Sequence, residues 1–361
     1  YKDRFEALIG RHSRNIKEEI EGGFTNAPFG CKIVLEEKAK KEILANIDGY
    51  LRSLNRGRII KEIATYHKVC NGSFSLKGFL AYSHIPFHKI YGSLTWGEMC
   101  QMAGVRNEVS AHSTQIKFAV TKKWLATDSF SYFTQLLRFV ESGFRCNTHT
   151  FSEQQKRCAA MLYYDLYDKA GTYASIEDMF RDLASDRLFI QELHEVVDYL
   201  RDRCSTPEKE DNSVYKEWNP LRLHGVYTKA QIQAALGLST IERKSTSREG
   251  MERLKDIKLE AMYVDIIKKR EEGSMTAYKD YAQNREFFHW ETQNRVRDGS
   301  REAEAYRNGE NNMLLFVRQQ VEHPDYGCRM GFTYLGQVTV KSIEGSKPMQ
   351  IVWHLNTPMS E

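Results

Sequence analysis

The sequence predicts an α+β protein in which the helical N-terminal two-thirds are followed by a small β-rich C-terminal domain, either a sheet or a barrel. Two observations support this prediction. Up to about residue 204, apolar residues recur at spacings of three and four, the period of an amphipathic helix. Beyond about residue 260, short runs of β-branched and aromatic residues stand between turn signals, which is typical of strands.

Length and composition limit the class of protein. A chain of 361 residues that is 41% hydrophobic can form two or three folded modules. No apolar run is long enough for a membrane span, the charged first residues lead into no signal peptide, and a start at Tyr1 suggests a piece of a longer protein. Seven scattered cysteines without a Cys-x-x-Cys pair favour a reducing cytoplasm over a disulfide framework. A net charge of +4 is too small to identify a partner.

The first two predicted segments are helical. Residues 1–56 form a connector, with one amphipathic helix near residues 5–16 and a second over about 36–54. Residues 57–109 form a small module resembling a helix-turn-helix unit. Its clearest signal is a capping box of Thr95 and Glu98, which starts a helix that faces Trp96 inward and that Gly104 ends.

Residues 110–205 are predicted to form a helical bundle. One stripe consists of Phe130, Phe133, Leu137 and Val140. Thr150 and Glu153 form a second capping box that opens the next helix. A polar, proline-bearing stretch at 204–213 then marks the main domain boundary.

Residues 206–361 are predicted to form the β-rich domain. Thr228 and Gln231 cap one helix near its start, and Gly237 ends that helix. Strands are expected over 262–267, 313–317, 332–335 and 349–355.

The strongest candidate site is an arginine-rich stretch over residues 285–307, together with a basic run after residue 267. Nucleic-acid surfaces need cations for phosphate, planar groups for stacking and amides for base edges, and all three occur in this stretch. The predicted nucleic-acid-binding residues are Arg285, His289, Gln293, Asn294, Arg295, Arg297, Arg301, Arg307, Lys268 and Lys269.

Core packing and surface ion pairs offer another explanation of the same stretch. Phe288 and Trp290 could alternate into a core, and for Trp290 we favour this role. The arginines would then pair with nearby acidic residues, namely Glu286, Glu291, Asp298 and Glu302.

Metal chemistry has weaker support. Asp265, Asp280 and Glu291, with Lys268 close by, could form the carboxylate cluster of a metal-dependent nuclease, but solvated surface charges explain them better. His84 and His88 have the spacing of zinc ligands on a helix, yet Pro86 between them argues against a regular helix. We therefore predict no metal site.

Phosphate-binding motifs are missing from the sequence. It has no Gly-x-x-x-x-Gly-Lys loop, and no glycine is followed directly by lysine. We expect no ATP hydrolysis and no cofactor in this chain, and we assign no catalytic residue.

Several stretches in fixed order resemble the uncharacterised domain that closes a class of bacterial superfamily-two DEAD/DEAH-type helicases. After residue 220 these stretches are 223–237, 278–282, 287–294, 314–318, 332–336, 344–349 and 353–355. Upstream, residues 27–31, 42–47 and 93–104 resemble the segments that follow the second helicase lobe. The chain departs from this pattern at residues 303–306, Ala-Glu-Ala-Tyr, where the relatives carry Gly-Gln-Arg-Tyr.

This resemblance implies a function. The chain would be the non-catalytic C-terminal part of a DNA helicase or translocase, binding or sensing DNA for a motor that uses ATP and Mg²⁺ elsewhere in the parent protein. Many members of the class carry a phospholipase-D-like nuclease, which suggests restriction or phage defence. The alternatives are a protein-interaction platform that docks the helicase onto a nuclease partner, and a metal-dependent nuclease domain. DNA and the motor domains are the expected partners, without a membrane.

Overall fold

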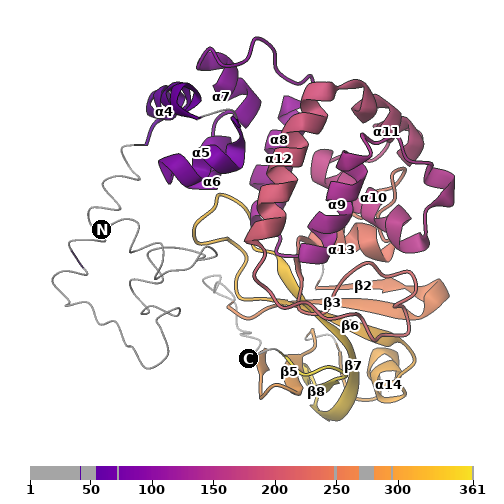
Figure 1. Cartoon of the computed structure of the whole chain (residues 1–361). Helices are drawn as coiled ribbons and strands as arrows, with labels where there is room; N and C mark the ends of the chain where they lie inside the picture. The colour runs from indigo at the N-terminus through magenta and orange to yellow at the C-terminus, as the bar shows by residue number, and fades with distance from the viewer. Residues whose placement is uncertain are drawn as a thin grey trace.

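The chain folds as a helical region over residues 56–203 followed by an eight-stranded mixed sheet between residues 226 and 355. Figure 1 shows the computed structural model, which describes residues 41, 54–70, 73–247, 250–267, 280–293 and 296–359. The predicted α+β class is confirmed. Of the two forms expected for the β-rich part, the structure has the open sheet and not the barrel.

Four short helices begin the described part: α4 (Arg56–Val69), α5 (Leu76–Ser83), α6 (Phe87–Tyr91) and α7 (Trp96–Met102). The capping box of Thr95 and Glu98 is confirmed at the start of α7. Trp96 is fully buried, with its ring 5.4 Å from that of Phe74 and 5.2 Å from that of Phe79. The two helices predicted upstream, near 5–16 and over 36–54, lie almost entirely outside the described residues.

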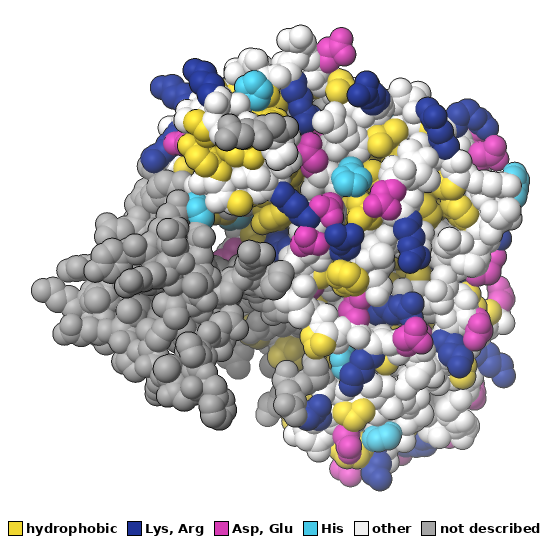
Figure 2. Space-filling model, in the orientation of Figure 1, with side chains coloured by type: hydrophobic (Ala, Val, Ile, Leu, Met, Phe, Trp, Pro, Cys, Tyr) yellow, Lys and Arg dark blue, Asp and Glu magenta, His cyan; other side chains and the backbone are white. Residues whose placement is uncertain are grey.

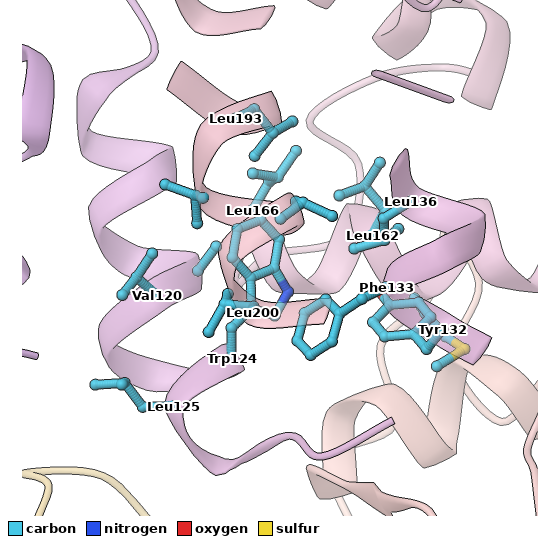
Figure 3. Close-up of a cluster of buried hydrophobic side chains, with 14 of the residues drawn as sticks. Val120, Trp124, Leu125, Tyr132, Phe133, Leu136, Leu162, Leu166, Leu193 and Leu200 are labelled. Atoms are coloured by element: carbon cyan, nitrogen blue, oxygen red, sulfur yellow. The ribbon is translucent and has the colours of Figure 1, made fainter. Parts of the chain in front are cut away.

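Five longer helices follow: α8 (Ser113–Lys122), α9 (Phe130–Glu141), α10 (Glu153–Leu166), α11 (Ile176–Ser185) and α12 (Arg187–Arg203). Figure 3 shows the buried ring of Trp124, just after α8, among leucines of α10 and α12, with Phe133 of α9 beside it. The ring centroids of Trp124 and Phe133 lie 6.3 Å apart. An apolar centre shared by four helices explains the helical periodicity of this region.

Two details of the predicted bundle are wrong. Phe130 is 51% exposed at the first position of α9, so it is not part of the buried stripe. The capping box that opens α10 consists of Ser152 and Gln155, not Thr150 and Glu153. Thr150 belongs to a 3-10 turn, so the extended residue that precedes the helix is Ser152.

The sheet has the strand order β2-β3-β6-β7-β8-β5-β4, with β1 paired to β7. Neighbouring strands are antiparallel except for β3 and β6, which are parallel. The strands predicted over 313–317, 332–335 and 349–355 are confirmed within β6, β7 and β8, and the one predicted over 262–267 overlaps β3, which ends at Asp265. The strands are β1 (Val226–Tyr227), β2 (Met251–Leu254), β3 (Leu259–Asp265), β4 (Tyr281–Ala282), β5 (Phe287–Glu291), β6 (Asn312–Arg318), β7 (Phe332–Gly345) and β8 (Met349–Leu355).

Both faces of the sheet are apolar, and each packs against a different layer. On one face, residues such as Ala261 and Phe316 join the core of the helical region, where α13 (Lys229–Leu236) packs against α10. The box of Thr228 and Gln231 and the left-handed Gly237 at the ends of α13 are confirmed. On the other face, alternate residues form a second core with Tyr306 of α14 (Arg301–Arg307). Figure 1 shows α14 on the side of the sheet away from the bundle. The domain boundaries stay predictions.

A glycine sets how closely the sheet approaches the helical region. A Cβ atom on Gly331, just before β7, would collide with the carbonyl oxygen of Ala126 and would lie 2.7 Å from a methyl group of Val226. We expect Gly331→Ala to lower the free energy of unfolding by roughly 2–3 kcal/mol, because backbone on both sides must move. Gly327→Ala is the control, since its Cβ would meet no atom within 4 Å. Urea denaturation that showed equal losses for the two variants would contradict this explanation.

Candidate functional site

The described residues of the predicted arginine patch have different surroundings. Lys268, Lys269, Asn294 and Arg295 lie outside the described residues. Arg285 lies in the turn between β4 and β5, where its Nε atom donates to the carbonyl oxygen of Met359 at 2.9 Å. Arg307, at the end of α14, pairs with Asp298 and with Glu304. For Arg307 the structure therefore has the ion pairing expected under the alternative interpretation, and its hydrogen bond lowers the pKa of Asp298.

Arg297 and Arg301 differ from these two. Both side chains are exposed, and within the described part of the chain neither guanidinium has an ion pair or a hydrogen bond. Arg297 follows the buried Val296, and Arg301 begins α14. These two cations are therefore available to an anionic partner.

Strand β5 carries the aromatic residues of the predicted patch. Phe288 is buried in the second core, and Trp290 packs beside it, with its ring 6.1 Å from that of Tyr306 and 6.3 Å from that of Trp353. The core-packing role favoured for Trp290 is confirmed. His289 is 8% exposed, and its ring stacks on that of Tyr281 at 4.8 Å.

A cleft of about 1380 Å³ lies between the two ends of the sheet, and we call it the seam cleft. One wall comes from β2 and β3, and the other comes from Asp280, Trp290 and the residues after β5. Tyr306 and Glu302 of α14 and the loop of residues 243–247 complete the lining. Because strands from opposite ends of the order line one space, the open sheet curls around it.

Several cations that the sequence analysis missed line the seam cleft. Arg243 and Lys255 are exposed, and neither has an ion pair with any described residue. Lys244 pairs with Asp168 at 2.8 Å, and Arg253 pairs with Glu260 at 2.7 Å. In the sequence these cations stand singly or as one pair among acidic and hydroxyl residues. No longer basic run marked them as a candidate site.

The same cleft has carboxyl groups, and three of them bond to other parts of the protein. Glu252 is buried and accepts from the Nε2 atom of Gln233 at 3.0 Å. Asp265 accepts from the Nε atom of Arg318 at 2.6 Å. Asp280, 6% exposed, accepts from the backbone N–H of Glu291 at 3.0 Å. Arg318 offsets the charge of Asp265, and Lys229, 3.9 Å from Glu252, offsets the charge of that carboxyl group.

The residues of the nuclease hypothesis, Asp265, Asp280 and Glu291, do line this one cleft. Even so, the described residues contain no group of three His, Cys, Asp or Glu side chains able to hold a metal ion. His84 ends α5 in a left-handed conformation with φ 55°, and His88 belongs to α6, so no single helix carries both. Burial and the nearby Lys89 and Arg203 lower the pKa of His88 to about 4.

The surface has no large area of one charge in the view of Figure 2, where basic and acidic side chains are interspersed. In the described ranges no helix is both long and apolar enough to cross a bilayer.

Comparison with known proteins places the seam cleft within a recognised domain. Residues 221–361 match the family model described as a domain of unknown function (DUF3427). No curated protein and no solved structure matches the chain. All residues that line the seam cleft lie within the matched range.

Proposed function

We propose that the chain is the non-catalytic C-terminal part of a DNA helicase or translocase, and that its seam cleft holds a single DNA strand for the motor. The observation that carries the proposal is the lining of that cleft. Arg243 and Lys255, which have no ion pair with a described residue, share it with the aromatic Trp290 and the amide of Gln293. The resemblance to superfamily-two helicases in the sequence supports the same function, and ATP and Mg²⁺ would belong to the motor.

The size of the seam cleft favours a polymer. A typical small-molecule site has a volume of about 300–1,000 Å³, and the seam cleft measures about 1380 Å³. Its walls hold four cations and six carboxyl groups together with aromatic rings and hydroxyl groups. Cations and aromatic rings are the groups that proteins use to follow a single strand. A duplex is a convex rod and would reach only the rim, whereas a flexible strand can enter a concave space.

In this proposal Arg297 and Arg301 lie at the rim of the seam cleft. Each lies beside a residue that lines the seam cleft, Val296 and Glu302 respectively. Their guanidinium groups, which pair with no described residue, would contact the phosphates of a strand as it enters or leaves. This pair therefore tests the proposal without disturbing buried contacts.

We expect the double variant Arg297→Ala and Arg301→Ala to bind single-stranded DNA about tenfold more weakly at low salt. The dependence of log affinity on log salt should flatten by about 1.4, since each phosphate contact on a single strand contributes about 0.7. Fluorescence anisotropy of a labelled strand across a salt series measures both quantities. The matched control is Arg138→Ala with Arg145→Ala, two exposed arginines of the helical region, which should change neither quantity.

Other outcomes separate the alternative functions. If the folded protein bound neither single strand nor duplex at low salt, the proposal would be wrong, and the protein-interaction platform would become the leading hypothesis. If the labelled strand were cut in a Mg²⁺-dependent way that Asp280→Ala abolishes, a nuclease would be favoured instead.

A further inference from the structure

A pair of lysines lies where the seam cleft meets the helical region. Lys244 lines the seam cleft, and its Nζ atom donates to the carbonyl oxygen of Asp168 at 2.6 Å and to a carboxyl oxygen of the same residue at 2.8 Å. The Nζ atom of Lys123, just after α8, lies 3.9 Å from that carboxyl oxygen. We call Lys123, Lys244 and Asp168 the junction site. Two ammonium groups share one carboxyl group there, so the site keeps an excess of positive charge.

Two further cations flank the junction site. Lys169 follows Asp168, and Arg243 precedes Lys244. Both residues are exposed, and neither has an ion pair with a described residue. The same two loops contribute two exposed carboxyl groups, those of Asp168 and Glu242, so cations outnumber acidic groups around the site.

Hydrogen bonds hold the two loops of the junction site together. The backbone N–H of Gly171 donates to the carbonyl oxygen of Ile241 at 2.7 Å. The hydroxyl group of Tyr164, on α10, donates to the carbonyl oxygen of Thr240 at 2.6 Å. The positions of the two loops are thus fixed before any ligand binds, and a site that is already ordered loses little conformational entropy on binding.

Lys123 is the unusual member of the junction site. Its side chain is 13% exposed, with the Nζ atom open to solvent and 5.3 Å from the centroid of the Phe118 ring. The ammonium group has no hydrogen bond to any described residue. Burial lowers its pKa, although Asp165 and Asp168 attract the charge. A largely buried cation without a hydrogen-bond acceptor is costly, so its surroundings favour an anion that completes the site.

We infer that the junction site binds a phosphate group of the DNA strand, at the point where the strand leaves the seam cleft and passes onto the helical region. The inference rests on the proposed function, because Lys244 belongs to both the seam cleft and the junction site. The phosphate would give Lys123 the acceptor that it lacks. Contacts of this kind position a strand without reading its sequence, and the compact ammonium group of lysine binds phosphate as a point charge.

The test compares two oligomers of deoxythymidine, of about 5 and about 15 nucleotides, of which the longer extends past the seam cleft. In fluorescence anisotropy with the full chain, Lys123→Met should weaken binding of the longer oligomer roughly fivefold at low salt and flatten its log–log salt dependence by about 0.7. Binding of the shorter oligomer should stay unchanged. Lys122→Met is the matched control and should change neither, because the Nζ atom of Lys122 donates to the carbonyl oxygen of Gly327, in another loop.

A second variant has an expected effect of opposite sign. Asp168→Asn removes the carboxyl group that the two lysines share, and the side chain is 62% exposed, so the fold should be retained. This variant should bind the longer oligomer roughly threefold more tightly, because both ammonium groups become available to phosphate. Glu153→Gln is its control: it likewise removes an exposed carboxyl group paired with a lysine, Lys156, and should change nothing.

The outcomes separate this inference from the proposed function. Equal affinity of the parent protein for the two oligomers, with both bound, would overturn the inference alone. A partly unfolded Lys123→Met would lose affinity for both oligomers, and Asp168→Asn then decides: tighter binding of the longer oligomer supports the junction site, and unchanged or weaker binding overturns it. Absence of binding to both oligomers would overturn the proposed function as well.

Discussion

Replacement of Asp165 by alanine is expected to lower the free energy of unfolding by about 3–5 kcal/mol. Asp165 of α10 is fully buried, and its Oδ2 atom accepts from the indole of Trp124 and the phenol of Tyr132, both at 2.6 Å. The Nε2 atom of Gln231 donates to its Oδ1 atom at 3.0 Å. Removal of the carboxyl group would leave these three buried donors without an acceptor, and each costs about 1–3 kcal/mol.

Because Gln231 also bonds to Asp165, the loss of unfolding free energy should involve both halves of the chain. Gln231 belongs to α13, in the C-terminal half, whereas Trp124 and Tyr132 belong to the helical region. Asp165→Ala should therefore weaken the packing of α13 on α10 as well as the bundle itself. Urea denaturation followed by circular dichroism and by tryptophan fluorescence measures the loss.

The control for this prediction is Asp168→Ala. Asp168 lies three positions further along the chain, its side chain is 62% exposed, and it pairs with Lys244 at 2.8 Å. An exposed ion pair contributes less than about 1 kcal/mol, so this variant should unfold almost like the parent protein. A loss below about 1 kcal/mol for Asp165→Ala would show that the three donors find other partners.

Local signals predicted the parts of the fold that short stretches of chain determine. The capping boxes at Thr95 and Thr228 each satisfy backbone donors within one turn, so four residues are enough to recognise them. At the start of α10 two candidate boxes overlap, beginning at Thr150 and at Ser152, and both have the required residue types. Only the path of the chain before the helix decides between them.

Long-range pairing was beyond the sequence analysis. Strand patterns predicted β3, β6, β7 and β8, but the order of the strands depends on contacts between residues far apart in the chain. Whether the ends of the sheet join into a barrel or stay open depends on β2 and β4, short edge strands of four and two residues with weak patterns. The prediction therefore left sheet and barrel as alternatives.

In the candidate site, too, the sequence predicted local features and missed those that depend on long-range contacts. The described arginines of the predicted patch belong to different elements: Arg285 to the turn before β5, Arg297 to the loop after it, and Arg301 and Arg307 to α14. The sequence analysis also missed Glu260, the buried partner of Arg253, although alternation along β3 places it on the same face as Met262 and Val264. A charged residue in register with an apolar face is a reason to expect a buried polar contact.

Glu192 should give the protein a pH-dependent stability. It is 1% exposed in α12, where its oxygens accept from the hydroxyl group of Tyr91 at 2.9 Å and the backbone N–H of Gly97 at 3.1 Å. Gly97 permits this approach, since a Cβ atom there would lie 2.6 Å from a carboxyl oxygen of Glu192. Burial raises the pKa of Glu192 from 4.5 to about 7, although both hydrogen bonds oppose the shift.

The sign of the effect follows from proton binding. Between pH 4.5 and about 7 the folded protein holds a proton on Glu192 that the unfolded chain has lost, so stability falls as the pH rises. The contribution is complete below pH 4.5 and is lost above about pH 7, and its size is about 3 kcal/mol. Glu192→Gln should remove this dependence, because a glutamine amide can accept from Gly97 and donate to the hydroxyl oxygen of Tyr91.

The measurement is the difference in unfolding free energy between Glu192→Gln and the parent protein, taken from urea denaturation at several pH values. This difference cancels the contributions of other titrating groups, such as Asp165, whose pKa burial raises to about 6. The unfolding free energy of Glu192→Gln should rise by about 3 kcal/mol relative to that of the parent protein as the pH rises from 4.5 to 8. Glu141→Gln, at an exposed position of α9, is the control and should give a flat difference. A flat difference for Glu192→Gln as well would mean that Glu192 keeps its ordinary pKa in the folded protein, and that water or Arg106 compensates for its burial.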